Sequence, residues 1–284
     1  MSFVSLQVIA GATANFLVIF LFATRRELRR KNSDLLILNL ALADFTSLTT
    51  FLPWNIYLTK LGRKEHSAYY TSLNTFCLFL SSTTVLTVAV DKFIAVVYPL
   101  RYTTLVTRTK TLFTILGTWL VATFLGIAHF TVDVFMSQQN HAILDKCLSV
   151  AVLIKMIFVV SLYIVVFKAV KNQLTLQRNL NNHKASSQRE KQENSFLKSA
   201  LNTFIVVCLF YATYLPYAVL QMMSIYANFV TWRRLFSFIY VNACINPLVY
   251  FFRIRRFRIA LFHIFNKGER SDTYVLSRSK VTDR

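Results

Sequence analysis

Acidic residues, glycine, proline and cysteine are all scarce in this 284-residue chain. Only 12 Asp and Glu accompany 32 Lys and Arg, and there are 5 Gly, 4 Pro and 4 Cys. Hydrophobic residues make up 55% of the chain, and no repeat or low-complexity segment stands out. This composition indicates a membrane protein with one helical domain.

Several functional signals are also missing. The four cysteines have no metal-ligand spacing and three lie within apolar runs, so we expect no disulfide framework. Paired catalytic carboxylates and nucleophile motifs are absent, so an enzyme is not expected. The chain shows no inverted repeat, which disfavours a transporter. The first apolar run is long and ends in basic residues, which argues against a cleavable signal peptide.

Apolar runs long enough to cross a bilayer recur along the chain. Segments rich in Lys and Arg alternate with poor ones, which predicts an outer N-terminus and a cytoplasmic C-terminus. The basic excess then faces anionic lipid and intracellular partners rather than nucleic acid. The predicted spans are Phe3–Thr24, Leu35–Leu58, Ser67–Tyr98, Thr111–Asp133, Ile143–Val170, Ser195–Tyr226 and Thr231–Phe252.

Polar residues inside these runs must face the protein interior, because lipid offers them no partners. Asp44 is a carboxylate near the middle of the second run, and Ser81, Asn242 and Asn246 could surround it. Hydroxyl, amide and carboxylate oxygens suit a sodium ion. The alternative is a hydrated polar core that binds no ion.

The motifs of these runs, in their order, resemble the rhodopsin-like family of G-protein-coupled receptors. The resemblance covers nearly the whole chain and includes Pro99 to Tyr102 in a loop. The matching residues within the runs are Asn15, Asn39 with Asp44, Asp91-Lys92-Phe93, Trp119, Tyr163, Phe210 with Pro216, and Asn246-Pro247 with Tyr250.

The resemblance implies an all-α seven-transmembrane bundle at the plasma membrane. It implies residues 1–254 as the receptor domain, with a third cytoplasmic loop at about 171–194. An amphipathic helix at 255–266 would lie on the cytoplasmic surface, and 267–284 would be a disordered cytoplasmic tail. The partners implied are an extracellular ligand of unknown identity, a heterotrimeric G protein, arrestin and receptor kinases.

The family's functional residues carry over to matching positions. An allosteric sodium ion, the one cofactor or metal expected, would be bound by Asp44, Ser81, Asn242 and Asn246. The residues implied in activation and G-protein coupling are Asp91, Lys92, Phe93, Tyr163, Phe210, Pro216, Pro247 and Tyr250.

The chain departs from the family pattern at several positions. Lys92 replaces an arginine and so loses a planar fork that holds two partners. Phe196 stands where many members carry an acid, so the restraint between the third and sixth helices looks absent. We therefore expect raised basal activity or else poor coupling. Tyr214 replaces the usual tryptophan, and Ser67 the usual third-helix cysteine.

Lys155 stands where the fifth helix commonly has proline. It either extends along the bundle toward water or has a direct ligand-binding or structural role. Loss of this proline, loss of the cysteine and a short second loop occur together in melanocortin receptors. In these features the chain resembles the group that melanocortin receptors form with adenosine and cannabinoid receptors.

The ligand itself is not identified by these motifs. Asn74 replaces the aspartate of amine receptors, and Tyr240 replaces the lysine that binds retinal, so neither ligand is expected. The remaining candidates are a small molecule, a lipid or a short peptide. Candidate pocket residues by alignment are Asn74, Leu78, Lys155, Tyr214, Tyr217, Gln221, Phe236 and Tyr240, although each aromatic could equally serve helix packing.

Two further hypotheses stay open. His66, His129 and His141 lie toward the outer side and would form a zinc or proton sensor if they converged, which sequence does not show. Lys92 and the missing cysteine also allow a non-signalling heptahelical protein that acts by partnering, retention or scavenging.

Overall fold

The structure is a computed structural model of the 284-residue chain. It describes residues 3–60, 68–180, 204, 207–208, 210–222, 234–235, 237–253 and 255–265. All regular elements in these residues are helical, which confirms the predicted all-α fold. Most of the predicted loop at 171–194 and the tail at 267–284 lie outside the described residues.

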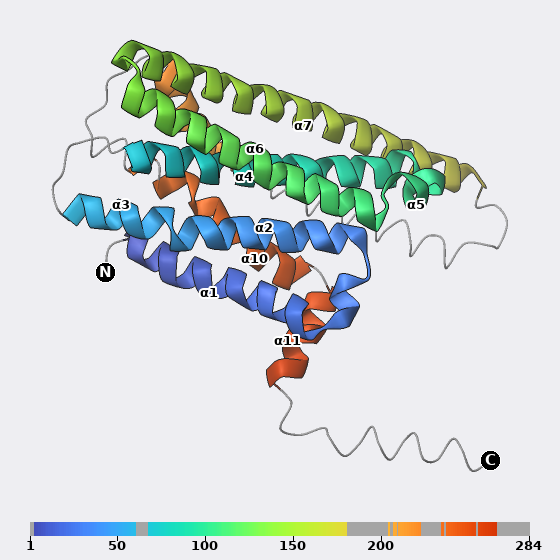
Figure 1. Ribbon diagram of the computed structural model, residues 1–284. Coiled ribbons are helices and arrows are strands. Elements are labelled where there is room, and N and C mark those ends of the chain that lie inside the picture. Colours follow the sequence, from blue (N-terminus) through green and yellow to red (C-terminus); the bar gives the residue numbers. More distant parts are fainter. Residues whose placement is uncertain are drawn as a thin grey trace.

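The long helices follow the predicted apolar runs (Figure 1). Residues 210–222 are also helical. An apolar helical segment, Ser237–Phe251, includes most of α10 and the residues just before it. Short turns connect the long helices: η1 (Arg26–Arg29), η2 (Pro99–Arg101) and α5 (Tyr102–Leu105). The labelled helices are α1 (Phe3–Thr24), α2 (Asn32–Thr49), α3 (Phe51–Lys60), α4 (Ala68–Val97), α6 (Arg108–Phe135), α7 (Gln138–Leu180), α10 (Val241–Arg253) and α11 (Arg255–Phe265).

Helix α4 lies at the centre of the bundle, in contact with α2, α6 and α7. The most apolar stretch of α4 is 67% buried, whereas the corresponding stretches of α6 and α7 are 22% buried. Those two helices expose large apolar side chains such as Phe113, Phe124 and Ile157. An apolar outer surface of this extent is typical of a lipid-facing bundle. Five helices in the described residues are long and apolar enough to cross a membrane.

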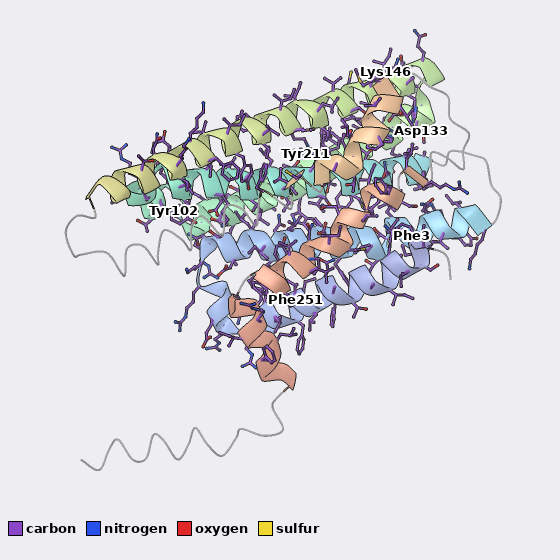
Figure 2. All side chains as sticks on the ribbon, turned by 180° about the vertical axis from the view of Figure 1, so that it is seen from behind. Phe3, Tyr102, Asp133, Lys146, Tyr211 and Phe251 are labelled. Atoms are coloured by element: carbon purple, nitrogen blue, oxygen red, sulfur yellow. The ribbon has the colours of Figure 1, made fainter. Side chains whose placement is uncertain are left out.

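The two ends of the bundle differ in the elements they carry. Helices α1, α4 and α7 begin at one end, called here the N-terminal end, and α11 lies at the other, the α11 end (Figure 1). Figure 2 shows Asp133 and Lys146 toward the N-terminal end and Tyr102 toward the α11 end. Only Met136 and Ser137 separate α6 from α7, so this connection is very short.

The second predicted span is divided into α2 and α3 at Thr50. Pro53 accounts for the division, because a proline ring clashes with the carbonyl four residues earlier, here that of Thr49, the last residue of α2. The Thr50 hydroxyl donates to the Thr46 carbonyl at 2.6 Å, and the Thr50 backbone N–H donates to the same oxygen at 2.9 Å. Together these bonds close the end of α2.

A second proline, Pro247, lies inside α10. By the same geometry it releases the carbonyl of Ala243 from its helical hydrogen bond. The Nδ2 atom of Asn15, on α1, donates to this carbonyl at 2.8 Å and to the Gly11 carbonyl at 2.9 Å. Asn15 is fully buried, so a neighbouring helix satisfies the backbone oxygen that proline frees.

Asn39 on α2 forms a second junction between helices. Its Nδ2 atom donates to Thr84 Oγ1 on α4 at 3.0 Å, and its Oδ1 atom accepts from Trp119 Nε1 on α6 at 2.9 Å. One buried amide therefore links three helices, using both its donor and its acceptor.

Helix α11 follows α10 after a single residue, and its largest buried side chain is Phe257. Phe257 is fully buried and lies 5.5 Å from the Phe22 ring and 6.2 Å from the Tyr250 ring, centre to centre. Arg258, Ile259 and Phe262 are exposed. The predicted amphipathic segment is thus helical and docks Phe257 on α1 and α10.

Helices α1 and α10 approach closely at Gly11. A Cβ atom at this position would lie 2.6 Å from Cys244 Sγ and 2.9 Å from Leu48 Cδ1. Gly117 on α6 offers a matched control, since a Cβ atom there would meet nothing within 4 Å.

We expect Gly11→Ala to lower the thermal unfolding midpoint of the purified protein in detergent. Overpacking costs about 1–3 kcal/mol, which outweighs the gain of roughly 1 kcal/mol in helix propensity. Gly117→Ala gains the same helix propensity without a steric clash, so it should not lower the unfolding midpoint. Equal shifts for the two variants, measured by a thiol-reactive dye during heating, would contradict this packing.

Candidate functional site

A cavity of about 220 Å³ lies toward the N-terminal end of the bundle. Side chains of α4, α6, α7 and the helical segment 210–222 converge on it. Its lining combines aromatic and aliphatic surface with hydroxyl, amide, imidazole and carboxylate groups, a mixture typical of small-ligand pockets. The lining residues are Thr71, Asn74, Thr75, Leu78, Phe79, His129, His141, Ala142, Asp145, Leu148, Ser149, Tyr214, Tyr217 and Gln221.

Five of the predicted pocket residues line this cavity: Asn74, Leu78, Tyr214, Tyr217 and Gln221. Tyr240 is buried one layer behind them, and its hydroxyl donates to Asn74 Oδ1 at 3.1 Å. Phe236 lies outside the described residues.

Lys155 does not line the cavity. Its Nζ atom donates to Ser82 Oγ on α4 at 2.7 Å and to Thr83 Oγ1 at 3.4 Å, and it lies 4.2 Å from the centre of the Phe79 ring. Two hydroxyl acceptors and an aromatic face hold the ammonium group inside the bundle. Of the roles left open by the sequence, this geometry favours a structural link between α7 and α4.

Asp44 lies at the centre of a second polar group, between α2 and α10. Its Oδ2 atom accepts from Asn246 Nδ2 at 2.7 Å, and the Ser81 hydroxyl lies within hydrogen-bonding reach of the carboxylate. Asp44 and Asn246 are almost completely buried. The buried oxygens Asn242 Oδ1 and Asn246 Oδ1 have no hydrogen-bond partner within the described residues.

The unpartnered oxygens bear on whether the predicted ligands suit a sodium ion. A buried acceptor without a donor is costly, and a cation offers an alternative partner. These amide oxygens and the Asp44 carboxylate are the kind of ligand atom that a hard cation prefers. The residues present therefore fit the ion that the sequence predicts.

A third polar group surrounds Asp91 at the α11 end of α4. Asp91 is buried and accepts from Ser33 Oγ at 2.7 Å, from Tyr102 Oη at 2.8 Å and from its neighbour Lys92 Nζ at 3.2 Å. Burial and the nearby Asp91 charge raise the pKa of the Tyr102 hydroxyl, which therefore stays protonated and donates. Sequence reasoning placed Tyr102 in the loop motif but did not identify Ser33.

The tyrosine and phenylalanine side chains among the other predicted coupling residues lie in aromatic contacts. Tyr163 lies 5.1 Å from the Phe204 ring, and Phe210 lies 5.2 Å from Tyr211, centre to centre. Phe93 packs against the cluster of Val96, Val166 and Val170. Tyr250 packs on Phe257, Pro247 is buried in α10, and Pro216 is exposed within residues 210–222.

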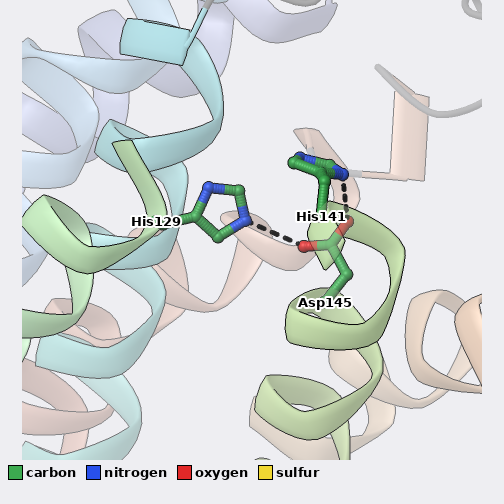
Figure 3. A group of neighbouring side chains, drawn as sticks. All are labelled: His129, His141 and Asp145. Atoms are coloured by element: carbon green, nitrogen blue, oxygen red, sulfur yellow. Dashed lines mark hydrogen bonds and ion pairs between the residues drawn. The ribbon is translucent and has the colours of Figure 1, made fainter. Parts of the chain in front are cut away.

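Two of the outer histidines come together, which sequence could not show. His129 on α6 and His141 on α7 meet at Asp145 (Figure 3). Asp133 Oδ1 lies 3.5 Å from His141 Nε2. His66 lies outside the described residues. Neither aspartate was identified from the sequence; the spacing of His141 and Asp145, four residues apart on one helix, was the available signal.

Comparison with known proteins identifies a family and its relatives. The family model described as "7 transmembrane receptor (rhodopsin family)" matches residues 14–250. Galanin receptor 2b of Danio rerio is 24% identical over 285 aligned positions, which cover 92% of this chain and 73% of the relative. The matched region spans all the polar groups described above.

The cavity predicts a difference in reactivity along α4. Leu78 lines the cavity, whereas Leu80 is fully buried in the core. In a background without the exposed Cys147 and Cys208, we expect Leu78→Cys to react with a charged methanethiosulfonate reagent much faster than Leu80→Cys. The measurement is the rate of mass change of the folded protein. Equal rates at the two positions would contradict the described cavity.

Proposed function

Since the chain belongs to the rhodopsin family of seven-transmembrane receptors, we propose that it couples an extracellular small-molecule, lipid or short-peptide ligand to heterotrimeric G-protein activation. It is a multi-pass membrane protein and a signalling receptor, not an enzyme. A family match extending over residues 14–250 supports this coarse assignment, and it includes the cavity, the Asp44 group and the Asp91 group.

The proposed orientation has the N-terminal end outside the cell and the α11 end in the cytoplasm. The distribution of basic residues supports it, because Arg25 to Lys31 and Lys92 to Lys110 both lie at the α11 end. The cavity then opens toward the outside and the Asp91 group lies where a G protein would bind. Arrestin and receptor kinases are further proposed partners at this face.

The observation that carries the ligand proposal is the convergence of Asn74, Tyr217 and Gln221 on one cavity. Amide groups fix the orientation of a ligand, and the aromatic and aliphatic walls contribute apolar burial. The name of the zebrafish relative adds galanin to the ligands to be tested.

Coupling is proposed to depend on the Asp91 group. In the structure the Lys92 amine donates to the Asp91 carboxylate, which also accepts hydrogen bonds from Ser33 and Tyr102. A lysine forms fewer simultaneous contacts than an arginine, so its ion pair with Asp91 restrains the end of α4 weakly. This supports raised basal activity over the alternative of poor coupling. Release of Lys92, with movement of Tyr163 and Tyr250, is the proposed step toward the active state.

The Asp44 group is proposed to bind sodium and stabilise the inactive state. Asp44 supplies the charge, and Ser81, Asn242 and Asn246 supply neutral oxygens. When bound, the ion would neutralise a carboxylate that is otherwise buried among amide and hydroxyl groups. Because the two unpartnered amide oxygens lie on α10, sodium would fasten α10 to α2.

We expect sodium to raise the thermal unfolding midpoint of the purified receptor relative to choline at equal ionic strength. Binding stabilises the native state by about 1.4 kcal/mol at ten times the dissociation constant. Asp44→Asn should abolish this rise. Asp34→Asn changes another buried aspartate of α2 and should retain it. A sodium-dependent rise that survives in Asp44→Asn would exclude this site.

The signalling proposal predicts coupling in the absence of ligand. We expect the native chain to activate at least one G protein above empty cells, measured by resonance-energy transfer across a G-protein panel at matched surface expression. Tyr102→Phe removes one donor to Asp91 and should raise this activity further. Tyr98→Phe is a matched control, since Tyr98 is exposed and its ring packs on Phe93.

Two outcomes distinguish the alternatives. Silence of the native chain with activity restored by Lys92→Arg would favour the non-signalling heptahelical protein suggested by the departure at Lys92. If Tyr102→Phe has the same ligand-free activity as the native chain, basal coupling does not depend on the Asp91 group.

A further inference from the structure

Three potential metal ligands converge between α6 and α7, on the wall of the cavity. His129 Nε2 lies 3.0 Å from Asp145 Oδ1, and His141 Nδ1 lies 3.6 Å from Asp145 Oδ2. One ligand atom from each of the three residues lies within 4.8 Å of the other two (Figure 3). Two imidazoles therefore share a single carboxylate.

These separations are close to those of a tetrahedral zinc site. Zinc bonds of about 2.0–2.2 Å to imidazole nitrogen and carboxylate oxygen place neighbouring ligand atoms roughly 3.3–3.5 Å apart. The two separations from Asp145, 3.0 and 3.6 Å, lie on either side of this range. The ligand nitrogens of the two histidines lie within 4.8 Å of each other, so side-chain rotation would have to bring them to the zinc spacing. Imidazole with carboxylate is a ligand set that zinc accepts, whereas magnesium and calcium prefer oxygen alone.

A second carboxylate, that of Asp133, lies behind the His141 ring. When its Nδ1 atom faces the shared carboxylate, its Nε2 atom faces Asp133 Oδ1 at 3.5 Å. Asp133 is itself held by the Thr71 hydroxyl on α4, which donates to Oδ2 at 3.0 Å. A carboxylate behind a histidine orients the ring and increases its basicity, as is usual around bound zinc.

Packing holds one of the two imidazoles in place. The His129 side chain is only 1% exposed, so its orientation is fixed by packing and not by solvent. A rigid imidazole directed at a carboxylate and a second imidazole is preorganised for a metal ion.

We propose that His129, His141 and Asp145 bind one zinc ion, with Asp133 as the residue that positions His141. Three protein ligands leave the fourth position open, and all three residues line the cavity, so this position is accessible to water or to a donor atom of a ligand. The metal would join the ends of α6 and α7. The inference rests on side-chain geometry and does not require the proposed signalling function.

The test is zinc binding to the purified full-length chain in lipid nanodiscs, measured by competition with a fluorescent chelator. We expect one zinc per chain. Asp133→Asn should weaken binding about 10–100-fold, and His129→Ala or His141→Ala should weaken it more than this. His263→Ala removes a histidine of α11, at the opposite end, and should leave the affinity unchanged.

Cobalt provides a second measurement that does not depend on affinity. Cobalt bound to the native chain should show visible ligand-field absorption, and His141→Cys should add a thiolate-to-cobalt charge-transfer band. The unfolding midpoint of each variant in metal-free buffer reports whether it is folded. Absence of stoichiometric zinc binding by the native chain would overturn the proposal, as would native affinity in folded His129→Ala and His141→Ala. Because no G protein is present, either result leaves the receptor proposal untouched.

Discussion

The hydrogen bond from Asn15 to the Ala243 carbonyl is the contact on which the arrangement of α1 and α10 depends. Pro247 creates the need for it by releasing that carbonyl inside an apolar bundle, where no lipid group can replace the lost donor. Gly11 makes the contact possible, because any side chain there would collide with Cys244 and Leu48. A proline, an asparagine and a glycine on two helices therefore form one structural unit.

The same constraint explains the other buried amides. Asn39 joins three helices, and Asn246 is tied to Asp44, so these buried amides also lie at junctions between helices. Such junctions can exchange partners without exposing apolar surface to water, which suits a bundle that must move. The residues that hold the bundle together are thus also those through which the Asp44 and Asp91 groups would change state.

Much of the fold followed from hydropathy, because lipid requires long apolar helices and tolerates few polar residues. The first apolar run of the sequence predicted the helix α1, and the polar residues and family motif placed Asn246 near Asp44. The sequence did not predict the attachment of Lys155 to Ser82, nor the meeting of His129, His141 and Asp145. These contacts depend on the rotation of one helix against another, and periodicity along a single helix carries no information about that rotation.

The two-residue connection between α6 and α7 has a kinetic consequence. Met136 and Ser137 are too few to fold back over the cavity, so this connection cannot act as a lid. On this side of the cavity a bound molecule would then be retained by its contacts with the side chains of α6 and α7, with no closing segment between these two helices. Residence time in this cavity should accordingly follow contact strength, and point changes on the helices should act mainly on the dissociation rate.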